Sequence, residues 1–208
     1  MKSYIIHFIR HGSIDDTLAG KYIGTTDAPL SDRGRMDLRK LDYEYKYPGT
    51  QVVFTSPLKR CTETAKILYP EQNPLVIDNL SECNFGEWEG KTADELKNDP
   101  DFKKWLAGDS SVKPPRGESN ADFTRRVCGR FEIIVEGLMK TGTTESVIVT
   151  HGGVIMTLLA VYGLPQAKPF EWTMDNGFGY SLRVTPVLWQ RDKVCEVFQT
   201  IPLPSEND

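Results

Sequence analysis

Four side chains that can bind an oxyanion lie at, or just beyond, the ends of apolar segments. They are Arg10, His11, Arg60 and His151. A glycine directly follows each of the two histidines. A guanidinium keeps its charge and offers phosphate oxygens a planar fork of N–H donors, and a neutral imidazole can attack phosphorus as a nucleophile. Any one of these residues alone is more commonly a surface ion pair or a hydrogen-bonded scaffold residue. The four together predict a site for a phosphoryl group.

The apolar segments before these side chains have the composition of buried strands. Residues 4–10, 51–55 and 146–150 are rich in β-branched, aliphatic and aromatic residues, and a helical pattern follows in each case. The carboxyl ends of parallel strands lie along one edge of a sheet, where such folds bind ligands, so the four side chains can converge there. The alternation predicts an α/β three-layer α/β/α sandwich with a mostly parallel central sheet and an antiparallel edge.

Cap residues place the helices between these strands. Ser31 is expected to cap one helix, and Ser56-Pro57 to begin the next, with proline at the first helical position. Ser119 and Asp122 are expected to form a capping box for the longest helix, which Gly142 ends.

Two further regions carry weaker patterns. Residues 179–189 and 194–201 are expected to be strands that pair as a hairpin at the sheet edge, around a polar turn at 190–193. The stretch 80–117 has little periodicity beyond two short helices, near 92–95 and 102–106. We expect it to form a lid-like excursion over the core that faces the substrate.

The composition restricts the class of protein. The chain has 208 residues, 26% of them charged, and a net charge of -4; a single domain spanning 1–208 is expected. This net charge does not indicate binding to nucleic acid or to an anionic membrane. The four cysteines are scattered, no apolar stretch is long enough to span a membrane, and the N-terminal pattern does not favour a signal peptide, so we expect a cytoplasmic protein. The sequence does not indicate an oligomeric state.

Arg10-His11-Gly12 resembles the signature of the histidine phosphatase superfamily, which has the phosphoglycerate mutase-like fold. Five more blocks similar to those of the family follow in the same order, up to about Gly163, and they are 24–31 with Gly34, 55–65, 80–90, 117–119 and 149–155. A tripeptide alone would be weak evidence, whereas six blocks in order are a strong match. The 80–90 block and Gly153 look like the phosphatase branch, and most like its α-ribazole phosphatases.

The resemblance implies a role for each matching residue. His11 would be the nucleophile that forms a phosphohistidine, and Glu82 would protonate the leaving oxygen. Arg10, Arg60 and His151 would hold the phosphoryl oxygens. Because two arginines supply the positive charge, no metal and no cofactor are expected.

Departures from the family pattern concern the phosphate pocket. The family commonly has Thr or Ser where Ile14 stands, and Asn where Thr17 stands. Thr17 keeps a hydroxyl that can bind substrate, and Gly152 offers a backbone N–H. Ile14 offers no polar side-chain atom, so a backbone N–H would have to take its place.

Several residues keep two interpretations. Glu87 and Glu89 compete with Glu82 for the acid role, although solvated loop charges or substrate-shaping groups describe them better. Trp88 and Trp105 either contact the substrate or belong to a small hydrophobic cluster, with Lys103, Lys104, Lys113 and Arg116 as substrate contacts or solvated charges. His7 lies mid-strand and is expected to be structural. A zinc site made from the three histidines is a weaker alternative, because they lack ligand spacing.

Three functions follow from these observations. The first is a metal-independent phosphomonoesterase that hydrolyses a small phosphorylated metabolite, with α-ribazole 5'-phosphate in cobalamin synthesis as the specific expectation. The second is a phosphoglycerate mutase-type phosphoryl transfer. The third is an inactive family member that binds a phosphorylated ligand or acts as a scaffold, which Ile14 and Thr17 make conceivable.

Overall fold

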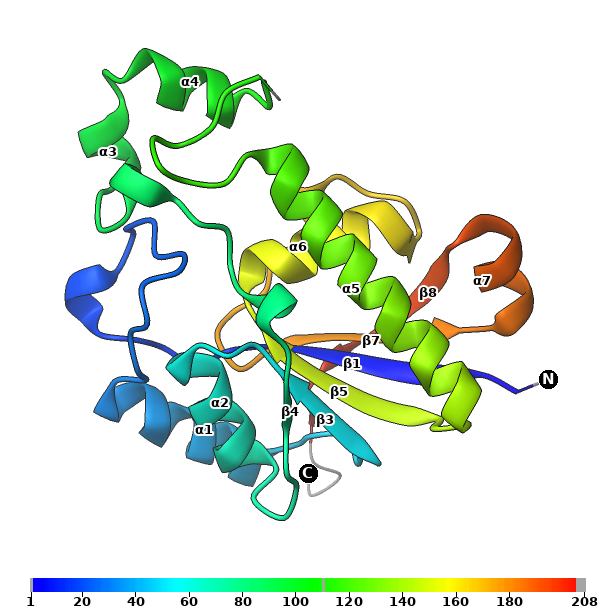
Figure 1. Cartoon of the computed structure of the whole chain (residues 1–208). Coiled ribbons are helices and arrows are strands. Elements are labelled where there is room, and N and C mark those ends of the chain that lie inside the picture. The colour runs from blue at the N-terminus through cyan, green and yellow to red at the C-terminus, as the bar shows by residue number, and fades with distance from the viewer. Residues whose placement is uncertain (1, 110, 205–208) are drawn as a thin grey trace.

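Strand β1 lies in the middle of a seven-stranded sheet with the order β4-β3-β5-β1-β7-β8-β6 in the computed structural model (Figure 1), which describes residues 2–109 and 111–204. The strands of this sheet are β1 (Tyr4–Arg10), β3 (Val52–Thr55), β4 (Leu75–Val76), β5 (Glu145–Thr150), β6 (Gly163–Leu164), β7 (Gly179–Val184) and β8 (Cys195–Ile201). A small second sheet pairs β2 (Tyr45–Lys46) with β9 (Leu203–Pro204).

The register aligns the ends of the three strands that precede the candidate residues. β5 runs parallel to both β1 and β3, with Arg10 opposite Thr150 and Thr55 opposite Val149. Antiparallel pairing in the large sheet involves β7, which pairs with β1 and with β8. The predicted mixed α/β class and mostly parallel sheet are confirmed.

Two helical layers cover the sheet (Figure 1). Helices α1 (Asp32–Glu44) and α2 (Lys59–Leu68) lie on one face, and α5 (Asn120–Thr141) and α6 (Gly152–Tyr162) lie on the other. The alternation along β1 explains this, because Ile6 and Phe8 join the core under α5 and α6, whereas Ile9 joins the core under α1 and α2.

Cap residues fix two of these helices as predicted. The Ser31 hydroxyl oxygen accepts from the Gly34 N–H at 2.9 Å, and Gly142 ends α5 with φ 75°. At the start of α5, the Ser119 hydroxyl accepts from the Asp122 N–H, so the expected N-cap is present. The Asp122 carboxylate accepts from the Ser119 hydroxyl and not from the Ser119 backbone N–H, so only half of the expected capping box forms.

Helix α2 begins at Lys59, and the expectation that Ser56-Pro57 starts it is wrong. The Asp27 carboxylate caps the N–H of Lys59 at 2.7 Å, after the extended backbone of Leu58, and the Ser56 hydroxyl lies 2.8 Å from the His151 ring. The sequence pattern could not reveal this contact, which joins two strand ends far apart in the chain.

The expected strand over 179–189 is also wrong beyond Val184. Residues Pro186–Asp192 form helix α7, with proline in its first turn and Trp189 buried against the core. The pairing of β7 with β8 that the hairpin implied is present, with α7 as the connection.

The excursion over 80–117 carries its own small aromatic core. It contains the 3-10 helices η2 (Asp78–Leu80) and η3 (Gly86–Trp88) and the helices α3 (Ala93–Leu96) and α4 (Pro100–Leu106). Thr92 and Glu95 form a capping box at the start of α3. Trp88 is 1% exposed and packs with Phe102, and Trp105 lies against this pair. Figure 1 shows α3 and α4 on the side of the sheet where β1 ends, beside the loop that holds η1 (Asp16–Leu18) and away from η4 (Pro169–Glu171).

Within residues 2–109 and 111–204, no helix combines the length and the apolar character that crossing a membrane requires.

Candidate active site

His11 follows β1 directly and has one ring nitrogen available. Its Nδ1 lies 2.7 Å from the carbonyl oxygen of Gly12, an acceptor, so Nδ1 carries the proton and the lone pair lies on Nε2. Burial and the guanidiniums of Arg60 and Arg10 lower the pKa of His11 to about 3. The ring is therefore neutral at neutral pH, with Nε2 in the state that a nucleophile needs.

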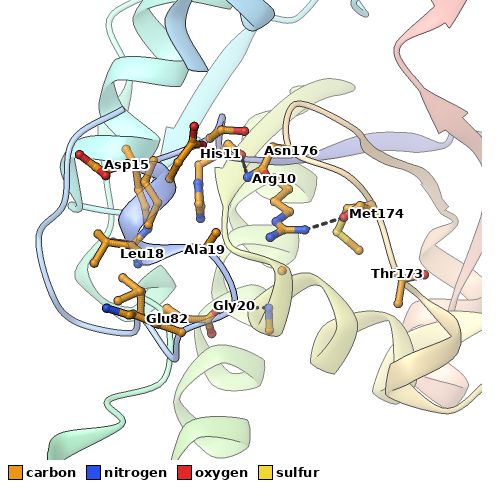
Figure 2. A pocket seen from close by; sticks show the side chains of 18 of the residues that line it. Arg10, His11, Asp15, Leu18, Ala19, Gly20, Glu82, Thr173, Met174 and Asn176 are labelled. Atoms are coloured by element: carbon orange, nitrogen blue, oxygen red, sulfur yellow. Dashed lines mark hydrogen bonds between the residues drawn. The ribbon is translucent and has the colours of Figure 1, made fainter. Parts of the chain in front are cut away.

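The backbone around His11 is held from two distant parts of the chain. The Asn176 side-chain amide donates to the His11 carbonyl oxygen at 2.7 Å (Figure 2), and the Gly12 N–H donates to the Thr64 hydroxyl at 3.0 Å. Because both bonds are buried or half-buried, they restrain the ring position that the strand end sets.

Arg10 has a donor prepared for an anion. One of its terminal N–H groups donates to the Met174 carbonyl oxygen at 2.7 Å, which fixes the guanidinium (Figure 2). Its Nε–H is buried and has no hydrogen-bond partner among the described residues. An unpaired buried donor is costly, and a bound phosphoryl oxygen would satisfy it.

Arg60 is buried and fixed through three of its nitrogens. Nε donates to Nδ1 of His151 at 3.2 Å, and the two terminal nitrogens donate to the carbonyl oxygens of Thr26 at 2.8 Å and Gly24 at 2.6 Å. Each terminal nitrogen carries two hydrogens, so one N–H on each remains for a ligand. Gly24 is required at this close approach, since a Cβ there would lie 1.8 Å from the Cys83 carbonyl oxygen.

His151 follows β5 and lies beside His11, with the ring centroids 5.2 Å apart. Because its Nδ1 accepts from Arg60, its Nε2 carries the proton and donates to the Ser56 hydroxyl at 2.8 Å. The ring is fully buried, and burial, with His11 and Arg60 nearby, lowers the pKa of His151 well below its ordinary value. His151 thus supports Arg60 here, and contact with a phosphoryl oxygen requires one of its two bonds to open.

The carboxyl group of Glu82 is buried and lies near the guanidiniums of Arg10 and Arg60. Its Oε1 accepts from the Cys83 N–H at 2.9 Å, and its Oε2 accepts from the Gly153 N–H at 3.0 Å. Burial raises the pKa of Glu82 above its ordinary value, although these N–H groups and the guanidiniums of Arg60 and Arg10 oppose the rise. The carboxyl has the environment of a proton donor.

The His11 ring, the Arg10 guanidinium and the Glu82 side chain surround a cavity of about 520 Å³ (Figure 2). Arg60 and the N-terminal end of α6 at Gly152 also line it. His151 is not among the described lining residues of this cavity. Apolar side chains form much of the remaining wall, and they are Ile14, Leu18, Ala19, Ile23, Met156 and Met174. The charged side chains farther from His11 are Asp15, Asp16 and Lys21.

The two departures from the family pattern lie differently. Ile14 lines the cavity, as its place in the pattern predicts. Thr17 is not among the described lining residues; its backbone N–H donates to the Asp15 carboxylate at 2.8 Å, and its hydroxyl also bonds to that carboxylate. The expectation that Thr17 contributes to the pocket has no support in this geometry.

Neither of the two competing glutamates lines the cavity. The Glu89 carboxylate accepts from the backbone N–H groups and hydroxyls of Thr25 and Thr26, which fixes the loop whose carbonyl groups hold Arg60. Glu87 lies at the surface, 3.3 Å from Arg116 in an ion pair. Glu82 is the glutamate that the described lining residues include.

The tryptophans of the excursion, Trp88 and Trp105, belong to the aromatic cluster described above and are not among the described lining residues of the cavity. The cations of the excursion are also not among those residues, and they are Lys103, Lys104, Lys113 and Arg116. The structure therefore favours packing for the rings and solvation for the charges.

His7 has the structural contacts that its mid-strand place predicts. Its Nδ1 lies 2.8 Å from the Ser181 hydroxyl, and its Nε2 lies 3.1 Å from the Glu145 carboxylate. Among the residues that the structure describes, no group of three or more His, Cys, Asp or Glu side chains is arranged to hold a metal ion.

Sequence reasoning missed the residues that anchor the site from late in the chain. Thr173, Met174 and Asn176 line the cavity, and the last two bond to Arg10 and His11. Asn176-Gly177 is a turn signal, but nothing in the sequence indicates that this turn returns to β1.

Comparison with protein families agrees with this site. The model of the histidine phosphatase superfamily (branch 1) matches residues 6–195, which is most of the chain. The chain belongs to this superfamily.

Two of the relatives that are similar in sequence are named as phosphatases. The chain is 30% identical to phosphoserine phosphatase 1 of Hydrogenobacter thermophilus over 174 residues, or 81% of each protein. It is 25% identical over 198 residues to the adenosylcobalamin/alpha-ribazole phosphatase of Salmonella typhimurium, covering 93% of this chain and 92% of that one. A solved phosphoglycerate mutase from Bacillus anthracis shares the fold, with a TM-score of 0.76 at 18% identity over 97% of this chain and 94% of that one.

Proposed function

We propose that the protein is a metal-independent phosphomonoesterase that works through a phosphohistidine on His11. One observation carries the proposal: the neutral His11 ring has its proton on Nδ1 and its lone pair on Nε2, and it lines a cavity together with Arg10, whose buried Nε–H has no hydrogen-bond partner among the described residues. A nucleophile and an unsatisfied cationic donor at one cavity suit a phosphate ester. The superfamily of the chain and the phosphatase names of its relatives support the same reaction.

The reaction has two steps. In the first, His11 Nε2 bonds to phosphorus, the bond from phosphorus to the leaving oxygen breaks, and the Glu82 carboxyl gives its proton to that oxygen. In the second, a water oxygen bonds to phosphorus, the phosphorus–nitrogen bond breaks, and the Glu82 carboxylate takes a proton from the water. Inorganic phosphate leaves, and the enzyme returns to its first state.

The charge on the transferring group is met by fixed donors. Arg10 and Arg60 line the cavity, and each has at least one N–H group with no bond to another described residue. The N-terminus of α6 at Gly152 adds its backbone N–H groups and dipole. Each such contact contributes roughly 3–4 kcal/mol to lowering the barrier. His151 orients Arg60 and reaches the phosphoryl oxygens only if one of its present hydrogen bonds opens.

The organic part of the substrate would lie against the apolar wall. The side chains of Ile14, Leu18, Ile23, Met156 and Met174 offer a surface for an apolar or aromatic group. We propose α-ribazole 5'-phosphate, whose base is aromatic, because one relative is named for that substrate. The phosphoserine phosphatase relative makes phosphoserine the necessary competitor in any test.

The test measures phosphate release from a panel of phosphorylated metabolites with a chelator present, including α-ribazole phosphate, phosphoserine and 3-phosphoglycerate. We expect turnover by the wild-type protein, no turnover by His11→Ala, and an acid-labile phosphoenzyme trapped on His11 by rapid quenching. Full turnover by His11→Ala contradicts the mechanism. Return of the phosphoryl group to the substrate, without release of phosphate, shows a mutase, and phosphate binding without a trapped phosphoenzyme shows an inactive binding protein.

A further inference from the structure

Arg126, on the first turns of α5, makes five hydrogen bonds around the segment that carries Glu82. Its guanidinium binds Glu118 through two parallel bonds, from Nε at 2.9 Å and from a terminal nitrogen at 2.8 Å. The remaining N–H groups donate to the carbonyl oxygens of Asn79 at 3.0 Å, Ser81 at 3.0 Å and Glu82 at 3.4 Å. The backbone before and at Glu82 is thereby curled around one rigid cation.

Glu118 extends this contact to the residues after Glu82. Its backbone N–H donates to the Asn84 carbonyl oxygen at 2.8 Å, and its carboxylate lies 3.4 Å from the Asn84 N–H. Gly117, next to it, approaches so closely that a Cβ would lie 2.5 Å from the same carbonyl oxygen. The chain is thus held on both sides of Glu82 by one ion pair.

The ion pair does not lie in the catalytic cavity. Arg126 and Glu118 line a separate cavity of about 360 Å³ on the other side of Glu82, and neither is among the described lining residues of the first cavity. The side chains of the pair are 23% and 16% exposed, so solvent screens their attraction only in part. The contacts of the pair reach the catalytic cavity through the segment that carries Glu82. The Arg126 charge also helps to lower the pKa of His151, and a lysine keeps that charge.

We propose that Arg126 and Glu118 are positioning residues that hold the Glu82 carboxyl where it protonates the leaving oxygen. This inference rests on the proposed acid role of Glu82. A guanidinium suits the task because its planar fork grips a carboxylate and several carbonyl groups at once, which an ammonium cannot do. An error of about 1 Å in the place of a catalytic group costs about a hundredfold in rate, so the clamp has a large effect without touching substrate.

Two aryl esters of nearly the same shape test the proposal. 4-Nitrophenolate leaves readily without a proton, whereas phenolate is more basic and needs the acid. A change that disturbs only Glu82 therefore slows phenyl phosphate more than 4-nitrophenyl phosphate. A general loosening of the fold slows both alike.

The main variant is Arg126→Lys, compared with Glu82→Gln. We expect the kcat/KM of Arg126→Lys for phenyl phosphate to fall roughly 10- to 100-fold, with that for 4-nitrophenyl phosphate nearly unaffected. The ratio kcat/KM reports the first step alone and not the later hydrolysis, in which Glu82 also acts. Inhibition by inorganic phosphate should not change, because the phosphate donors are untouched. Arg125→Lys is the matched control, because Arg125 precedes it on α5, is exposed and pairs with Asp122.

Each outcome separates the inference from the proposed function. Equal losses on both esters, or no loss, in Arg126→Lys overturn the positioning role if Glu82→Gln shows the selective loss. If Glu82→Gln shows no selective loss, the acid role fails and the positioning role fails with it. If Arg126→Lys does not fold, Glu118→Gln takes its place, where a selective loss supports the proposal and any other pattern overturns it.

Discussion

Replacing Gly153 with alanine tests how closely the acid must be held. A Cβ at this position would lie 2.4 Å from Glu82 Oε1, whereas ordinary contacts begin at 3.4 Å, so the carboxylate must move by about 1 Å. That move also stretches the 3.0 Å bond from the Gly153 N–H to Oε2. A misplacement of about 1 Å predicts a loss of about a hundredfold in kcat for an ester with a basic leaving group.

Stability should not follow activity in this variant. Gly153 lies in the first turn of α6, and alanine is favoured over glycine in a helix by up to about 1 kcal/mol. Gly129→Ala is the matched control, because a Cβ at this exposed glycine of α5 meets nothing within 4 Å. The control should gain stability and keep full activity.

The assay measures kcat and kcat/KM for phenyl phosphate and 4-nitrophenyl phosphate, and urea unfolding, for both variants. Wild-type turnover of phenyl phosphate by folded Gly153→Ala would show that the reaction does not depend on where the Glu82 carboxyl lies. The assignment of the acid would then be wrong.

Three further predictions concern the nucleophile and the arginine cradle. Folded His11 stays neutral down to about pH 3, so between about pH 6.5 and 3 the unfolded chain binds more protons than the folded chain does. The free energy of unfolding should therefore fall as the pH falls through that window. The variant His11→Gln should show a weaker fall in urea titrations. Arg60→Lys should lower kcat/KM by roughly 100- to 1,000-fold in steady-state assays, because an ammonium cannot replace the fork; a change under tenfold would contradict its role. Glu89→Gln should cost about 1 kcal/mol in urea unfolding and weaken phosphate inhibition, because an amide has one acceptor oxygen and can serve only one of Thr25 and Thr26. Unchanged phosphate inhibition would show that this loop does not control Arg60.

The convergence of the site could be predicted because strand ends obey a simple geometric rule. Arg10 and His151 follow parallel neighbours, and the register places Arg10 opposite the residue just before His151. Periodicity and turn residues suffice for such a prediction, since each signal lies within a few residues of the side chain that it positions.

What the sequence could not show are the contacts between distant segments. The Ser56 hydroxyl meets the His151 ring at the end of another strand, and Met174 fixes Arg10 from a loop with no recognisable motif. The five bonds of Arg126 have the same character, because all of them reach carbonyl groups or a carboxylate outside α5. Local pattern contains no information on such partners, and tertiary packing decides them.

The central place of β1 has a consequence for the order of folding. β1 is the first strand to be synthesised, yet both of its neighbours come late in the chain, with Ile5 opposite Glu145 and Tyr4 opposite Val184. Pairing over such separations closes long loops and is slow to form. A nascent chain that already exposes Arg10 and His11 therefore has no sheet to hold them, and these side chains gain their environment only after β5 and β7 have been synthesised.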